Sequence, residues 1–73
     1  MMIGSLLKEY RLKQNKSQRK FIGSIVTQSY YSKVERNIHQ ISADELIAIL
    51  NGHHIDNAAF FAHLSSSNSQ KKR

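Results

Sequence analysis

The chain has 73 residues, no cysteine and no proline, and its formal net charge at pH 7 is +6. This length allows one domain with a modest core, and the lack of cysteine excludes disulfides and thiolate metal sites and fits a reducing cytoplasm. No apolar run approaches the roughly 20 residues that a membrane span needs. An excess of Lys and Arg on so small a body indicates a polyanionic partner.

Three helices are predicted in the first half of the chain. Apolar residues with helical spacing predict the first helix over residues 3–14. Ser17 is a suitable N-cap for a second helix over 18–24, and Thr27 is suitable for a third over 28–36. The segment that joins the second helix to the third contains glycine and is predicted to form a tight turn.

Two further helices are predicted in the second half. Ser42 and Glu45 have the spacing of a capping box, which predicts a fourth helix that ends at Leu50 or Asn51. Asp56 is expected to cap a fifth helix over 57–64. No alternating strand pattern is found, so the predicted fold is all-α, a compact bundle of five helices.

The last nine residues differ from the rest of the chain in composition. Residues 65–73 are rich in Ser, end in Lys71-Lys72-Arg73 and contain no apolar residue. A segment of this kind has nothing to pack against a core. The sequence therefore predicts a folded domain over 1–64 and a disordered basic tail over 65–73.

The second and third predicted helices both begin with a hydroxyl N-cap followed by glutamine, as Ser17-Gln18 and Thr27-Gln28. A helix N-terminus offers free amides and a partial positive charge, which suit a phosphate. Ser17, Gln18 and Thr27 are therefore candidates for phosphate contacts, which fix the register of a protein on DNA. Gln28 has a paired donor and acceptor that match N6 and N7 of adenine, so it is a candidate for contacting a base in the major groove.

The outward face of the third helix continues this pattern. Ser29, Ser32 and Lys33 lie on the same predicted face as Gln28, and Lys33 could meet guanine or a phosphate. The residues that follow the helix supply further candidates for phosphate contacts: Arg36, Asn37 and His39. The plainer interpretation of this face is a solvated polar surface.

A set of residues spread over about residues 3–55 forms a wider pattern: Ile3-Gly4, Arg11, Ser17-Gln18, Phe21-Ile22, Val26-Thr27, Tyr31-Ser32, Val34-Glu35-Arg36, Ser42, Leu46 and Ile49. Over this stretch the chain resembles the phage-repressor-like, or Xre-type, helix-turn-helix family. More narrowly, the segments 25–36 and 41–47 look like the N-terminal domain of the Rgg/GadR/MutR regulators.

The resemblance implies a lambda-repressor-like domain of a cytoplasmic bacterial transcriptional regulator, with the third helix in the major groove of double-stranded DNA. It also implies a buried pair between Arg11 and Glu35 and, in a longer protein, a regulatory domain that responds to peptides. The sequence departs from the family in the loop after the third helix. Asn37 stands where glycine is common, and Gln40-Ile41 lacks the usual proline.

Two adjacent aromatic residues, Phe60 and Phe61, indicate how two copies of the chain could associate. On a helix they point about 100° apart, so one can enter the core while the other stays near the surface. An exposed aromatic is a suitable anchor for a homodimer, and dimers of such domains pair two half-sites on DNA.

A basic helical chain of this size could also bind an acidic protein or a membrane surface instead of DNA. A basic adaptor or antitoxin-like module that meets an acidic protein is the main alternative, and a peripheral membrane helix is disfavoured because the basic residues are spread over several helices. No cofactor or enzyme activity is expected, since no catalytic arrangement is found. Neither cysteine nor a carboxylate cluster completes a metal site with the four histidines, which are His39, His53, His54 and His63.

Overall fold

The computed structural model describes residues 2–70, and within them the chain forms helices and no strand. This confirms the all-α prediction. The helices, in chain order, are α1 (Ile3–Lys13), α2 (Gln18–Ile22), α3 (Gln28–Glu35), α4 (Ala43–Gly52) and α5 (Asn57–Gln70).

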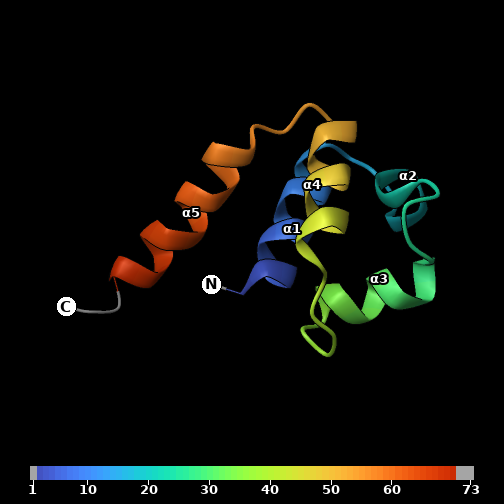
Figure 1. The fold of residues 1–73 in the computed structure, drawn as a ribbon, viewed down its shortest axis with the longest axis horizontal. Helices are drawn as coiled ribbons and strands as arrows, with labels where there is room; N and C mark the ends of the chain where they lie inside the picture. Colours follow the sequence, from blue (N-terminus) through green and yellow to red (C-terminus); the bar gives the residue numbers. More distant parts are fainter. Residues whose placement is uncertain (1, 71–73) are drawn as a thin grey trace.

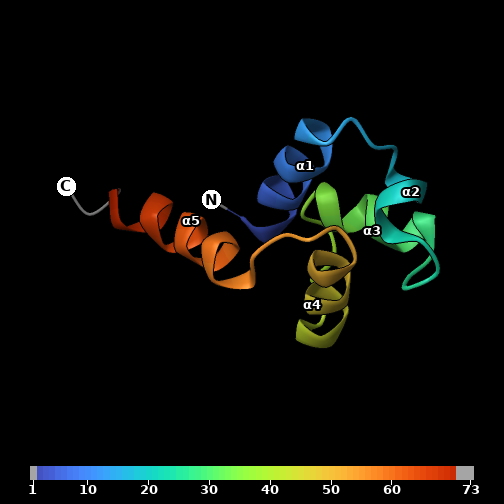
Figure 2. The same cartoon turned by 90° about the horizontal axis from the view of Figure 1, so that it is seen from above.

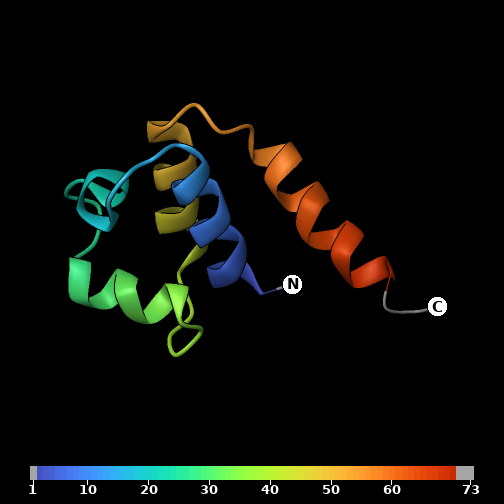
Figure 3. The same cartoon turned by 180° about the vertical axis from the view of Figure 1, so that it is seen from behind.

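The helices divide the molecule into a centre and two ends. α1 and α4 lie in the middle, α2 and α3 lie together at one end, and α5 lies at the opposite end (Figure 1). The same order is visible from above (Figure 2) and from behind (Figure 3). The segment over α2 and α3 is therefore remote from the C-terminal helix.

One apolar cluster joins all five helices. Its fully buried members include Leu7 of α1, Tyr31 of α3, Ile49 and Leu50 of α4, and Phe60 of α5, each with 0% of its surface exposed. Burial of a large apolar side chain stabilises the fold by about 1.5–3 kcal/mol. The core therefore fixes the direction of each helix, including the two that carry the predicted DNA contacts.

The predicted N-caps are present. The Ser17 hydroxyl accepts a hydrogen bond from the Lys20 amide, and the Thr27 hydroxyl accepts one from the Tyr30 amide, each at 3.2 Å. The capping box at the start of α4 is complete in both directions, and the Asp56 carboxylate accepts from the Ala59 amide at 3.2 Å. Each such cap contributes about 1 kcal/mol.

All five helix ends differ from the predicted ones, and the differences at α2 and α5 have a clear physical reason. α2 ends at Ile22 rather than Ser24, because Gly23 takes a φ of +56° that breaks the helical path. α5 continues past Leu64 to Gln70, since neither proline nor glycine interrupts its sequence. Residues 71–73 of the predicted tail lie outside the described residues.

The loop after α3 tolerates asparagine in place of glycine. Asn37 has a φ of +63°, a left-handed conformation that asparagine adopts more readily than most residues. The Asn37 side-chain amide donates to the Ser5 hydroxyl at 3.2 Å, which joins the loop to the start of α1.

A close approach between α1 and α3 positions the third helix. A Cβ atom at Gly4 would lie 1.9 Å from the Val34 carbonyl oxygen and 2.7 Å from Oδ1 of Asn37. No side chain fits at this distance, so glycine allows the end of α3 to pack directly on the backbone of α1.

Candidate nucleic-acid interface

α3 has one face in the core and one face directed outward. Tyr31, Val34 and Glu35 are buried. On the other side, Gln28 and Ser29 are exposed, whereas the side chains one turn further on are half-buried, namely Ser32 and Lys33. The spacing of these four residues places them along one side of the helix. α3 therefore brings together all four predicted base contacts.

The predicted phosphate contacts at the helix starts are partly engaged within the protein. The hydroxyls of Ser17 and Thr27 cap their own helices. The side-chain amide of Gln18 donates to Oε1 of Glu35 at 3.2 Å. An amide nitrogen carries two hydrogens, so Gln18 keeps one donor and its carbonyl oxygen for another partner.

The three predicted phosphate contacts after α3 differ in the contacts that their side chains make within the protein. Arg36 is exposed at the C-cap. Asn37 is held by Ser5, as described above. The exposed His39 ring stacks on Tyr30, with the ring centroids 6.0 Å apart and the planes at 23°. All three residues are exposed, and two of them, Asn37 and His39, are held by neighbouring side chains.

Tyr30 braces the loop that carries these residues. Its hydroxyl donates to the Gln40 carbonyl at 2.9 Å and lies 3.2 Å from Oε1 of Glu45. The side chain is half-buried. The Tyr30 hydroxyl therefore joins α3 to the loop and to α4.

Arg11 and Glu35 form a buried ion pair beneath α3. Nε of Arg11 lies 2.7 Å from Oε2 of Glu35, and Nη2 lies 3.0 Å from Oε1. A third bond runs from Nη1 of Arg11 to the Lys16 carbonyl at 2.9 Å, just before the start of α2. The pairing implied by the sequence is present, and it also joins the entry of α2 to the end of α3.

The environment of Glu35 keeps its carboxylate charged. Burial disfavours the charge, but the hydrogen bonds from Arg11 and Gln18, the nearby Tyr31 hydroxyl and the positive charge of Arg11 together outweigh burial, so the pKa of Glu35 lies below its ordinary value. The hydrogen bond to Glu35 raises the pKa of Arg11, which favours the charged form of the guanidinium as well. Both partners are therefore ionised at neutral pH, and their charges cancel within the core.

The surface over α2 and α3 is strongly biased toward positive charge. Between Tyr10 and Ala43, Glu35 is the sole acidic residue, and it is neutralised by Arg11. The same segment carries six further basic residues: Lys13, Lys16, Arg19, Lys20, Lys33 and Arg36. This excess favours contact with a polyanion at the end of the molecule where α2 and α3 lie.

The family model described as Helix-turn-helix, of the Xre type, matches residues 7–55 of the chain. The chain belongs to the helix-turn-helix family. Comparison with curated proteins and comparison with solved structures each gave no significant match. This family is one of DNA-binding, non-enzymatic domains. The matched residues include α2 and α3, which the family resemblance implies to be the two helices of the motif.

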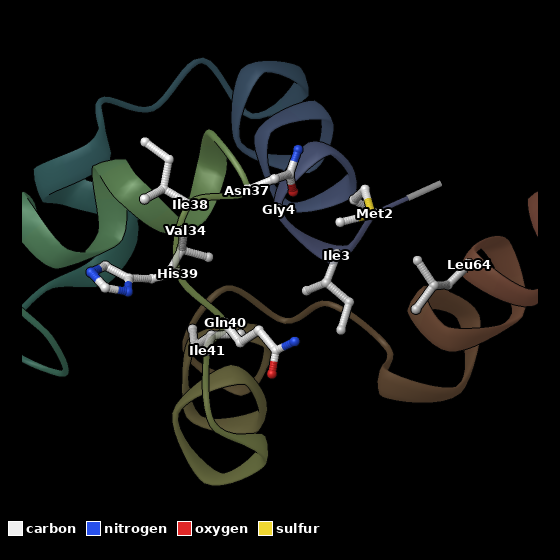
Figure 4. A pocket seen from close by; sticks show the side chains of 10 residues that line it. All are labelled: Met2, Ile3, Gly4, Val34, Asn37, Ile38, His39, Gln40, Ile41 and Leu64. Atoms are coloured by element: carbon white, nitrogen blue, oxygen red, sulfur yellow. The ribbon is translucent and has the colours of Figure 1, made fainter.

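A hollow of about 520 Å³ lies on another part of the helix-turn-helix domain. It is bounded by the start of α1, the loop after α3 and Leu64 of α5 (Figure 4). Ile3, Val34 and Ile41 contribute apolar walls, and none of the residues that line it within the described part of the chain is a carboxylate, lysine or arginine. Apart from His39, the hollow therefore offers apolar and amide surface rather than groups for acid–base chemistry.

Two kinds of feature are absent from the described residues. Residues 2–70 contain no group of three or more His, Cys, Asp or Glu side chains that could hold a metal ion. No helix among these residues is both long and apolar enough to cross a bilayer.

Proposed function

We propose that the chain is the sequence-specific DNA-binding domain of a bacterial transcriptional regulator that acts in the cytoplasm. The observation that carries this proposal is the outward face of α3. It is polar, it starts at a capped N-terminus, and it lies in a segment whose single carboxylate is neutralised in the core. A helix of this kind suits the major groove, where polar side chains meet base edges.

The proposed contacts divide between bases and phosphates. Gln28, Ser29, Ser32 and Lys33 contact base edges, and Gln28 pairs with adenine. The phosphate contacts come from both helix starts and from the loop after α3, namely Ser17, Gln18, Thr27, Arg36, Asn37 and His39. Phosphate contacts hold the domain in register, whereas base contacts select the sequence.

The proposed assembly is a homodimer on a two-fold operator. Phe60 is fully buried, whereas the adjacent Phe61 is 40% exposed on α5. Exposed aromatic side chains are frequent anchors of interfaces, and a symmetric dimer matches two half-sites about one turn apart. The likeness to the Rgg/GadR/MutR regulators supports a further, peptide-responsive regulatory domain in a longer protein.

Selection of bound duplexes from a random pool, followed by titration at several salt concentrations, tests the proposal. A recovered duplex should bind more tightly than its scrambled counterpart, and the affinity for both should fall steeply as salt rises, by about 0.9 log units per log unit of salt for each phosphate contacted. Equal affinity for all duplexes would contradict sequence-specific binding. Tight binding to an acidic protein without any duplex preference would favour the adaptor function.

A further inference from the structure

His53 lies at the C-cap of α4 and contacts α2 across the core. Its ring stacks on the ring of Phe21, with the centroids 4.6 Å apart and the planes at 10°. Nε2 of the same ring is hydrogen-bonded to the Phe21 backbone carbonyl. One side chain from α4 thus makes both an apolar and a polar contact with the first helix of the motif.

The carbonyl that His53 contacts needs a partner from outside α2. The last carbonyls of a helix have no partner within the helix, and α2 has five residues. The Gly23 amide donates to the Arg19 carbonyl, and the Ile25 amide donates to the Ile22 carbonyl. The imidazole of His53 is therefore the hydrogen-bond partner of the Phe21 carbonyl, because no backbone amide of the turn after α2 donates to it.

The second ring nitrogen of His53 fixes the tautomer. Nδ1 lies 2.7 Å from Nζ of Lys16, in the segment between α1 and α2. A lysine ammonium only donates, so Nδ1 must be an unprotonated acceptor. The ring hydrogen is then on Nε2, where it is donated to the Phe21 carbonyl. The two contacts require the same neutral tautomer.

The contact continues to α3, the helix proposed to enter the major groove. Phe21 lies between His53 and Tyr31 of α3, with the Phe21 and Tyr31 centroids 6.1 Å apart and the rings tilted by 48°. Phe21 and Tyr31 are almost fully buried. Because packed rings of this kind do not shift independently, the position of His53 influences the placement of both helices of the motif.

We propose that His53 is a positioning residue for DNA binding: as the Nε2–H tautomer it fixes the start and the end of α2, and through Phe21 it fixes α2 relative to α3. The inference rests on the proposed DNA-binding function. It also accounts for a histidine that belongs to no metal-binding cluster among residues 2–70 and that does not lie on the outward face of α3.

Three variants separate positioning from simple stability. His53→Phe keeps an aromatic ring but loses both hydrogen bonds, and His53→Gln places an amide donor where Nε2 lies. His54→Asn is the control, because the adjacent His54 is exposed and has a φ of +57° that asparagine tolerates. Affinity for a duplex recovered by selection is measured at a temperature where thermal melts show every variant to be folded.

His53→Phe should weaken binding about five- to tenfold, because it removes both ring hydrogen bonds and only part of their free energy is expressed in DNA affinity. His53→Gln should recover part of that loss, and His54→Asn should match the parent. If His53→Phe lowers only the melting temperature and leaves the affinity of the folded protein unchanged, His53 has no positioning role. The same conclusion follows if the glutamine variant binds no better than the phenylalanine variant.

A measurement on the free protein keeps this inference separate from the proposed function. In the ¹⁵N-labelled chain, His53 should give a slowly exchanging Nε2–H signal, and Lys16→Met should shift the Nδ1 resonance while exposed His54 shows neither effect. Absence of that signal, or hydrogen on Nδ1, would overturn the inference even if DNA binds. Failure of the parent to bind any duplex while the signal is present would instead refute the DNA-binding function and, with it, the positioning role.

Discussion

The carboxylate of Glu35 accepts hydrogen bonds from two different helices: from Arg11 of α1 at 2.7 and 3.0 Å and from Gln18 of α2 at 3.2 Å. Glu35 itself is the last residue of α3. Three helices therefore meet at one buried charge, and the side chain proposed to contact a phosphate is oriented by a group that does not face DNA.

The Arg11–Glu35 pair predicts strong coupling between the two residues. Arg11→Ala and Glu35→Ala should each destabilise the fold by about 3–5 kcal/mol, because each leaves a buried charge without its partner. The double variant should lose less than the sum of the two single losses. Thermal or denaturant melts of the four proteins measure this coupling, and additive losses would show that the pair is not energetically linked.

The stability of the domain should depend on pH through Glu35. The pKa of its carboxyl is lower in the folded chain than its ordinary value of 4.5, so protons bind the unfolded chain more readily. The stability that this carboxylate contributes should be complete above about pH 4.5 and should be lost as the pH falls through the folded value. Denaturant melts from pH 6 to pH 2.5 test this, with Glu35→Gln as the variant that lacks the step. A parent whose acid dependence equals that of Glu35→Gln would contradict the prediction.

The close approach of α1 to α3 can be tested by substituting Gly4, with Gly52 as the matched control position. Gly4→Ala should destabilise the domain by about 1–3 kcal/mol or more, because the new methyl group overlaps the Val34 carbonyl. Gly52→Ala has nothing within 4 Å of the added Cβ and should be neutral or slightly stabilising. Equal melting temperatures for the two variants would show that α1 and α3 do not pack as closely as described.

The adjacent rings on α5 predict different effects on assembly and on stability. Phe60→Ser should destabilise the fold by about 3–5 kcal/mol, since Phe60 is fully buried and its ring centroid lies 5.3 Å from that of Tyr10. Phe61→Ser should leave the melting temperature nearly unchanged and should weaken the dimer. Sedimentation of the parent and of Phe61→Ser decides: a parent that stays monomeric at millimolar concentration, or a dimer that Phe61→Ser does not weaken, excludes the anchor.

Local features of this fold were predictable from the sequence. Ser17, Thr27, Ser42 and Asp56 cap their helices as expected, because a cap depends on residues only a few positions apart. Helical spacing also predicted that one of the two adjacent rings would be buried and the other exposed, but not that Phe60 would be the buried one. The end of α5 was missed, because Ser and Asn weaken a helix without stopping it as Pro does.

The candidate site was predicted in part. The four outward residues of α3 follow from helical spacing, whereas the contacts beneath them join distant segments. The bond from Gln18 to Glu35 spans 17 positions, and the contact from His53 to Lys16 spans 37. No periodicity signals a pairing of this kind. Gly4 matched the family pattern, but its contact with Val34 depends on how α1 and α3 cross.

The central claim is that α3 selects a DNA sequence through its outward face, and Gln28→Ala tests it most directly. The exposed Gln28 side chain takes no part in the core, so the variant should melt at the temperature of the parent. On a duplex recovered by selection it should bind more weakly by about 1–3 kcal/mol, the value of one bidentate base contact, while its affinity for a scrambled duplex stays nearly the same. An equal loss on both duplexes, or no loss on either, would contradict the account.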